Sequence, residues 1–449
     1  MTHQVPSGVV MLMAALLILP LPYPSARAST IGEVMDALVR DAEVSSLELA
    51  GADADVAGQL AALDAARARF LPSIDLDLRY SRADGGRSVS FPNPAIPGET
   101  LSFNFLRSRE QESTLRLTQP LFDRRISSAS RVAAAQYEGS LDGREALRAR
   151  LSRDIRQGFL AWLTAGESVG ILEASLEAAT ENERVNRSLY QNGKVTRDQL
   201  LRAEADRLEV EEQLTAARAA GENARRYVNL LRSRPLDEPL AAAAATDADI
   251  ASWWNRLQAA PDSLTAQATR QRRDLRQLDH GIEAAAAAED LARAAFVPRL
   301  ALAVDTGIQG EAYGFGADDR FTLASLVLRF NLFSGGADRA AVREARAISA
   351  QLRAQRERLT QQVGLEVAAA LQDYEVAEAS LRRAEKRVEA AEGAFEIARR
   401  KRDLGQIPQV EFIDSRRALT QARLSRQFGR YEALGALVAI EYAIGAFPR

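Results

Sequence analysis

The amino-acid sequence predicts a mainly α-helical protein with a smaller β membrane part, built from one structural unit that occurs twice. The first copy passes through Leu71-Pro72, a stretch of alternating residues and Leu121-Phe122 before it enters a long helical run. The second copy passes through Val297-Pro298, alternating residues and Leu332-Phe333 in the same order. Each copy is therefore expected to hold a helix, a strand pair and a long helical hairpin. A repeat of this size restricts the fold far more than composition does.

The N-terminus has the pattern of a secretory signal peptide over residues 1–28. The apolar run Val9–Leu21 has signal-peptide length and is too short to cross a bilayer as a helix. Ala26-Arg27-Ala28 forms a small-residue cleavage site, although only His3 stands where a basic segment normally lies. We therefore expect an exported mature chain that begins near Ser29.

Residues 29–232 and 263–449 are the predicted repeats, and residues 233–262 form a connector between them. In both repeats, apolar and polar residues alternate in two short stretches, which is the period of a half-buried strand. Each strand pair leads into a long proline-free run that stops at a glycine turn, which predicts a helical hairpin. The expected boundaries are strands at about 73–81, 113–119, 299–306 and 320–331, helical hairpins at about 126–232 and 337–445, and turns at 192–195 and 404–408.

Four local features refine this outline. A helix is expected over 31–69, because leucines and valines recur among alanines until Pro72 ends the run. The prolines of Phe91–Gly98 predict a loop between the first two strands.

The apolar positions change phase near Ala324-Ser325, which indicates either a β-bulge or a strand that passes between two environments. In the connector, Trp253-Trp254 is expected to pack in a small subdomain rather than to mark a membrane interface.

The predicted strands have one apolar and one polar face. Ile74, Leu76 and Leu78 alternate with Asp75 and Asp77. No segment after the signal peptide is an apolar run of about 20 residues, so a membrane part must be built from strands. Four strands cannot close a barrel, since about 8 are the least that leave an interior for side chains. A membrane location therefore requires several copies of the chain.

The two proline-free runs are too long for a globular domain. At about 1.5 Å per residue, each would reach on the order of 100 Å. In the second run, large residues recur every seven positions with alanines between them, which predicts closely packed coiled-coil helices. The large residues are Tyr374, Leu381, Val388 and Phe395, and the alanines are Ala377, Ala384, Ala391 and Ala398.

In their order and duplication, these pieces resemble the outer-membrane efflux (TolC-like) family of Gram-negative bacteria. The resemblance covers the mature chain and is carried by Thr118–Phe122, Arg329–Gly336, Asp198–Ala203 and Glu411–Asp414. It implies a homotrimer whose twelve-stranded β-barrel lies in outer-membrane lipid and continues as an α-helical coiled-coil barrel in the periplasm. It further implies a periplasmic adaptor (membrane fusion) protein and an inner-membrane pump as partners. Substrates would then leave by passive passage, in efflux or in type I secretion.

The resemblance also implies a periplasmic aperture near the glycine turns. In the family, acidic residues six and nine positions after the second glycine form rings across the trimer, and here these positions hold Glu411 and Asp414. Threefold symmetry would bring like charges together, which raises their repulsion and attracts cations. The first copy departs from this pattern, because Gln199 and Arg202 occupy the corresponding places.

Further residues near the turns complete this candidate site. Arg202, Arg416 or Arg417 could pair with the two acids and help to hold a closed state. The turns themselves are candidate contacts for the adaptor, through Asn192, Gly193, Leu404 and Gly405. The alternative interpretation of Glu411 and Asp414 is that they are solvated carboxylates on a coiled-coil surface.

The sequence favours no enzymatic function. His280 is the one histidine outside the predicted signal peptide, and it is more typical of a surface or packing position than of a catalytic site. There is no cysteine and no Walker-type phosphate loop, so we expect no thiolate metal site, no metal cluster and no cofactor. The net charge of −3 implies no bulk attraction to nucleic acid.

The alternative to a channel is a periplasmic coiled-coil structural or adaptor protein of an export complex. Adaptors carry one helical hairpin flanked by lipoyl-like β segments, whereas this sequence predicts two hairpins and strands with bilayer-suited faces. The sequence leaves the cargo open between drugs, metals, peptides and secreted proteins.

Overall fold

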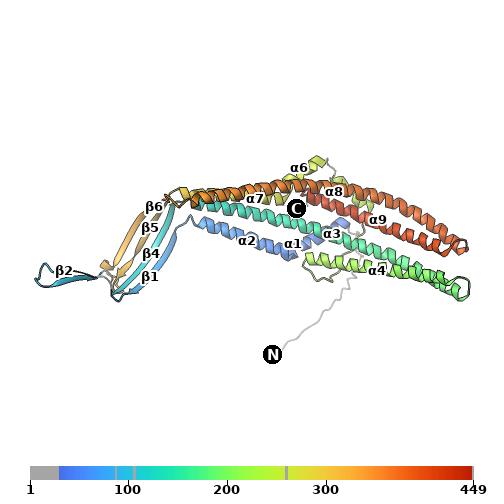
Figure 1. Ribbon diagram of the computed structural model, residues 1–449, viewed down its shortest axis with the longest axis horizontal. Coiled ribbons are helices and arrows are strands. Elements are labelled where there is room, and N and C mark those ends of the chain that lie inside the picture. The colour runs from blue at the N-terminus through green and yellow to red at the C-terminus, as the bar shows by residue number, and fades with distance from the viewer. Residues whose placement is uncertain (1–29, 86–87, 105–107, 258–260, 447–449) are drawn as a thin grey trace, which may run out of the picture.

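The computed structural model describes residues 30–85, 88–104, 108–257 and 261–446. The predicted signal peptide over 1–28 lies outside these residues. The described chain is elongated, with a β-sheet towards one end and long helices at the other (Figure 1). The fold is thus mainly helical with a sheet part, as the sequence predicts.

Similar elements follow one another twice along the chain. The first set is α1 (Ile31–Ser45), α2 (Leu47–Ala68), β1 (Ser73–Arg82), β2 (Ser88–Pro92), β3 (Thr100–Asn104), β4 (Arg109–Phe122), α3 (Arg124–Gln191) and α4 (Arg197–Leu231). The short helix α5 (Asp247–Leu257) follows in the segment that the sequence predicts as a connector. The second set is α6 (Pro261–Gln271), α7 (Arg273–Arg293), η1 (Ala294–Phe296), β5 (Arg299–Gly310), η2 (Ala317–Asp319), β6 (Arg320–Arg329), α8 (Ala337–Asp403) and α9 (Gln409–Ala443).

The sheet joins the two copies. Its strands are antiparallel and lie in the order β1-β4-β5-β6. Strand β4 of the first copy pairs with β5 of the second, from Gln111 opposite Gly310 to Phe122 opposite Leu300. Strands β1 and β6 lie at the edges, and within the described chain each of them pairs on one side only.

The predicted loop around Phe91–Gly98 proves to contain a β-hairpin. Strand β2 pairs with β3 in a separate two-stranded sheet, which projects beyond the four-stranded sheet (Figure 1). Phe91 lies opposite Leu101, and Pro92 is the last residue of β2. Proline has no backbone N–H, and at the end of a strand this costs few of the hydrogen bonds between the two strands. The prolines therefore mark the turn of this hairpin and not the whole segment.

The phase change in β6 does not come from a bulge. The register of β5 with β6 runs unbroken through Ala324 and Ser325, so the predicted β-bulge at this place is wrong. The apolar residues of β6 instead change face along a regular strand. The irregularity of the sheet lies between Pro120 and Phe122 of β4, where proline cannot donate a ladder hydrogen bond.

The helix predicted over 31–69 is two helices, α1 and α2. The backbone of Ser46 is extended, with φ −65° and ψ 122°, and its hydroxyl accepts a hydrogen bond from the N–H of Leu49. The hydroxyl of Ser45 donates to the carbonyl oxygen of Arg232 at the end of α4. Serine breaks the run here because its side chain caps the new helix.

The long helices reverse at glycines, as the sequence predicts. Gly193 after α3 has φ 66° and Gly405 after α8 has φ 68°, a left-handed backbone that L side chains rarely adopt. The N–H of Lys194 donates to the carbonyl oxygen of Leu189 at 2.8 Å, and Gln406 makes the matching bond to Lys401 at 2.8 Å. Both hairpin tips lie at the same end of the molecule, away from the sheet (Figure 1).

The main core lies in the middle of the helical part, where α1 and α5 cover the long helices. Trp253 of α5 is buried, and Trp254 stacks on Tyr374 of α8 with ring centroids 4.2 Å apart, so the tryptophan pair packs inside the fold as predicted. The heptad stripe of α8 is buried at Tyr374, Ala377 and Leu381. No helix within the described ranges is long and apolar enough to cross a membrane.

Candidate functional site

One face of the sheet is apolar and exposed. Ile74, Leu76 and Leu78 of β1 are each at least 63% exposed, and Leu326 and Leu328 of β6 are at least 66% exposed. Because antiparallel partners lie on the same face, the register places these five side chains on one side of the sheet. The chain itself leaves this apolar surface largely uncovered.

The opposite face of the sheet carries charges. Asp75 of β1, Arg116 of β4 and Asp305 of β5 lie side by side in the register. The Arg116 guanidinium donates to both oxygens of Asp305, at 2.7 and 3.2 Å. A further cross-strand ion pair joins Arg79 to Glu112 at 3.9 Å. This face is therefore suited to water, and the opposite face is not.

Glu411 and Asp414 lie in the first turns of α9, close to the second hairpin tip. Both are exposed, and neither carboxylate makes a hydrogen bond or an ion pair within the described chain. The residues between them, Phe412 and Ile413, are 3% and 5% exposed. Phe412 packs against Phe395 of α8 with ring centroids 5.7 Å apart, so the buried pair fixes the direction in which the two acids point.

Arg416 and Arg417 form ion pairs with α4 and not with Glu411 or Asp414 of the same chain. The side chains of Arg416 and Asp206 are 3% and 1% exposed, and one guanidinium nitrogen contacts both carboxylate oxygens at 2.7 Å. Arg416 also donates to the carbonyl oxygen and the hydroxyl of Ser175 on α3. Arg417 contacts Asp206 at 3.0 Å and Glu209 at 2.6 Å.

The third candidate arginine lies apart from this cluster. Arg202 is exposed and lies 4.0 Å from Asp198, one helical turn earlier on α4. Asp206 is thus the residue that the sequence reasoning missed. The sequence does hold a feature that could have identified Asp206. It interrupts the apolar stripe of Ala203, Val210 and Leu214, and a carboxylate buried in such a stripe requires a charged partner.

The hairpin tips expose both the predicted turn residues and neighbouring apolar side chains. Asn192, Gly193, Leu404 and Gly405 are all exposed, with Leu404 at 70%. Apolar residues within a few turns of the tips are exposed too: Leu189, Tyr190, Leu201, Ile397 and Val410. Exposed apolar surface of this kind is typical of a contact with another protein.

His280 of α7 lies in an ion-pair cluster between α7 and α3. Its ring nitrogens lie 3.4 Å from Asp142 and 3.0 Å from Glu283, and Asp142 also binds Arg273 at 2.8 Å. Groups of three or more His, Cys, Asp or Glu side chains that could hold a metal ion do not occur in the described ranges.

The chain thus combines one four-stranded sheet, built from both copies, with two long helical hairpins, and comparisons with known proteins identify this class of protein. The sequence profile of the family described as "Outer membrane efflux protein" matches residues 38–232 and 264–446. The chain therefore belongs to the outer membrane efflux protein family, and the resemblance seen in its sequence is confirmed. Membership places the protein in the outer membrane.

Individual proteins are similar to this chain in sequence or in fold. The chain is 28% identical over 290 residues to the alkaline protease secretion protein AprF of Pseudomonas aeruginosa, an alignment that covers 62% of this chain and 56% of AprF. Its fold matches the CmeC outer membrane channel of Campylobacter jejuni with a TM-score of 0.79 at 18% identity, covering 99% of this chain and 94% of CmeC. It also matches the open state of the MtrE outer membrane channel of Neisseria gonorrhoeae with a TM-score of 0.75 at 19% identity, covering 92% and 88%.

Proposed function

We propose that three copies of this chain form a channel through the outer membrane that continues as a helical tunnel into the periplasm. The observation that carries the proposal is a four-stranded sheet with two open edges and an exposed apolar face, joined directly to very long helices. The 68 residues of α3 correspond to about 100 Å of helix. Substrates would leave through this tunnel by passive passage.

Closure of the sheet requires more than one copy. Four strands give too small a ring, whereas three copies would supply twelve strands and leave no edge. The number three rests on the family resemblance. In such a barrel the exposed leucines and isoleucine would face lipid, and the face with Arg116 and Asp305 would line a hydrated interior. The helices would continue this barrel as a coiled-coil tunnel.

The hairpin tips suit contact with a periplasmic adaptor (membrane fusion) protein. They lie at the end opposite the sheet, and they expose Leu404 together with the turn glycines Gly193 and Gly405. An inner-membrane pump would deliver the substrate to this end. Residues 29–232 and 263–449 would supply the two structural repeats of each copy, and residues 233–262 would form the connector around the middle of the tunnel.

The acids of α9 suit a gate. In a symmetric trimer, three copies of Glu411 and of Asp414 would form two rings of like charge, which repel one another and attract cations. The direction of both side chains is fixed by the buried Phe412 and Ile413. Arg416 and Arg417 would act indirectly, because they hold α9 against Asp206 of α4. Arg202 of the first hairpin would face the same aperture.

Efflux and type I secretion are the two transport classes that fit this architecture. The name of AprF links that relative to the secretion of a protease, which favours export of a protein as one use of the channel. We infer no catalytic role and no cofactor, because the proposed function requires only passage. The alternative function, a periplasmic structural or adaptor protein, is disfavoured by the exposed apolar sheet face, which such a protein would have to bury.

Conductance in planar lipid bilayers tests this proposal. The purified protein should give single-channel conductance that multivalent cations such as hexamminecobalt(III) block from the helical side. Glu411→Gln/Asp414→Asn should weaken this block by about tenfold or more, because neutral rings no longer attract the cation. Glu385→Gln/Glu389→Gln is the matched control, since it removes two charges from exposed positions of α8 and should leave the block unchanged. Equal block in all three proteins would contradict the gate, and the absence of conductance would contradict the channel.

A further inference from the structure

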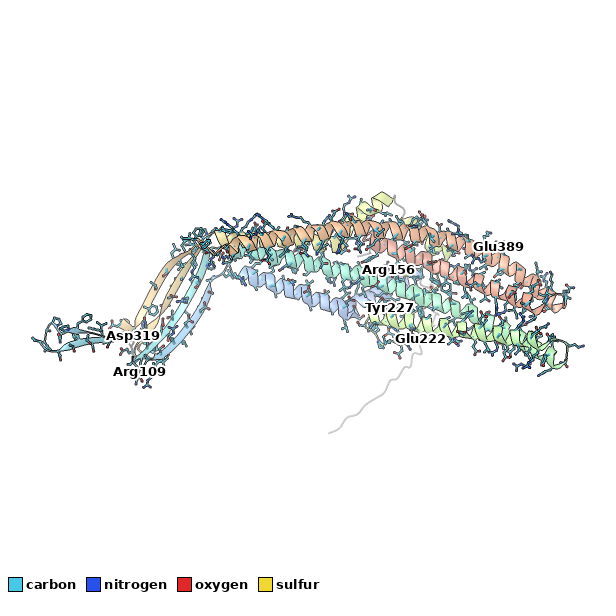
Figure 2. The ribbon with its side chains drawn as sticks, viewed as in Figure 1. Arg109, Arg156, Glu222, Tyr227, Asp319 and Glu389 are labelled. Atoms are coloured by element: carbon cyan, nitrogen blue, oxygen red, sulfur yellow. The ribbon has the colours of Figure 1, made fainter. Side chains whose placement is uncertain are left out.

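The loop between β5 and β6 wraps around a single carboxylate, that of Asp319. Asp319 lies at the end of the sheet that is remote from the helices (Figure 2). Its Oδ2 accepts a hydrogen bond of 3.2 Å from the N–H of Gly316. Side chains at Gly310 and Gly314 would lie against its two oxygens, so these glycines leave the carboxylate room to approach the backbone.

The other oxygen of Asp319 faces a small space beside Gly310. A methyl group added at Gly310 would lie 3.2 Å from Oδ1 of Asp319, 3.3 Å from the carbonyl oxygen of Ala312 and 3.8 Å from the side-chain amide of Gln111. Within the described chain, neither Oδ1 of Asp319 nor the carbonyl oxygen of Ala312 accepts a hydrogen bond. The two acceptors would repel each other across this space unless a cation or a hydrogen-bond donor lies between them.

Gln111 supplies the second, independent observation. Its side chain is 0% exposed, and neither its amide nitrogen nor its amide oxygen has a hydrogen-bond partner among the described residues. A buried amide without partners is costly, and it commonly marks a bound ion or water. The amide nitrogen is the end that lies towards Gly310. Because the two ends of an amide have nearly the same shape, the group can be rotated by 180°, which would place its oxygen there instead.

We propose that this loop binds a calcium ion beside Gly310, with Asp319, the Ala312 carbonyl and the Gln111 amide oxygen as protein ligands. Calcium accepts carboxylate, backbone carbonyl and side-chain amide oxygens in flexible geometry and completes its shell with water. With one carboxylate in the set, the affinity belongs to the weak range, with a Kd on the order of 10⁻⁴ to 10⁻³ M. The bound ion would tie the β5–β6 loop to strand β4. The site is independent of conduction, so its test is separate from that of the channel.

Terbium luminescence tests the site on the full mature protein in detergent. Tb³⁺ replaces Ca²⁺ at oxygen sites and emits when a nearby tyrosine is excited, and Tyr80 lies directly opposite Gln111 in the sheet. We expect saturable emission that Ca²⁺ displaces. Asp319→Asn should weaken Tb³⁺ and Ca²⁺ binding by more than about tenfold. Gly310→Ala should weaken it as well, because its methyl group fills the space while φ at this position is not in the left-handed region.

Asp318→Asn is the matched control, since Asp318 is the exposed neighbour in the same loop and carries the same charge. It should retain binding within about twofold, as expected of an acid outside the coordination shell. Isothermal titration with Ca²⁺ repeats the comparison without a tyrosine donor, and thermal unfolding of each variant shows that it is folded. Calcium binding that is equal in the wild type, Asp319→Asn and Gly310→Ala would overturn the proposal. The proposal would also be overturned if the wild-type protein bound no Ca²⁺ in the titration, because the space beside Gly310 would then hold water only.

Discussion

At the scale of single residues, the buried pair of Arg416 and Asp206 is the interaction with the largest expected consequence. Arg416→Ala leaves the Asp206 carboxylate buried without its main partner, so we expect a loss of about 3–5 kcal/mol in the free energy of unfolding. Chemical unfolding of the protein in detergent measures this difference. Arg417→Ala is the control, because Arg417 is 45% exposed and its removal should cost about 1 kcal/mol or less. Equal losses in the two variants would contradict a buried lock between α9 and α4.

Asp41 gives a residue-scale prediction about pH. Hydrogen bonds from Arg234 and then Arg232 hold the pKa of this carboxyl below its usual value of 3.8, although partial burial acts in the opposite direction. Because the pKa is lower in the folded state, the stabilisation is present above about pH 3.8 and is lost as the pH falls through the lowered folded pKa. Asp41→Asn should therefore cost about 1 kcal/mol at neutral pH and progressively less in acid. A cost that is the same at pH 7 and at pH 3 would contradict this assignment.

At the scale of elements, the glycine turns decide where the long helices reverse. Gly405→Ala places a side chain at φ 68° and should destabilise the protein by about 1 kcal/mol. Gly393→Ala is the matched control, because Gly393 lies inside α8 with no atom within 4 Å of an added methyl group. It should stabilise the helix by up to about 1 kcal/mol. Thermal unfolding should thus move in opposite directions for the two variants, and a shift of the same sign would contradict the turn assignment.

The elements also show how far the sequence determines this fold. The long helices, the four main strands and both glycine turns follow from periodicity and turn chemistry, because each signal extends over many residues. The sequence reasoning missed the break at Ser46, since a single serine rarely ends a strong helical pattern and the decisive contact comes from distant Arg232. It also missed the β2–β3 hairpin, whose strands are only five residues long each.

The candidate site came from the family resemblance, which singles out Glu411 and Asp414 at six and nine positions after Gly405. The structure places both on the exposed side of α9, and their role as a gate stays a prediction. The partners of Arg416 and Arg417 could not be predicted in the same way. These arginines bind Asp206, which lies on the other hairpin, and pairing between distant helices depends on how the two hairpins pack.

At the scale of the whole molecule, the central claim is that open sheets from three copies close into one ring. The chain contains no cysteine, so introduced cysteines report on single contacts. In one chain, β4 and β5 lie between β1 and β6, so the two edge strands are three strand spacings of about 4.8 Å apart. The resulting separation of roughly 14 Å is too large for a disulfide within the chain. In the proposed trimer, β1 of one copy would lie beside β6 of the next.

Disulfide cross-linking between these edges tests the claim most directly. Thr322→Cys in β6 would be combined in turn with Ile74→Cys, Leu76→Cys and Leu78→Cys in β1, which covers the possible registers on the apolar face. Oxidation in isolated outer membranes, followed by denaturing electrophoresis without reductant, would then display the products. We expect at least one pair to give a covalent trimer and no larger species. Only monomers in all three pairs, or a ladder that continues beyond the trimer, would contradict a closed ring of three chains.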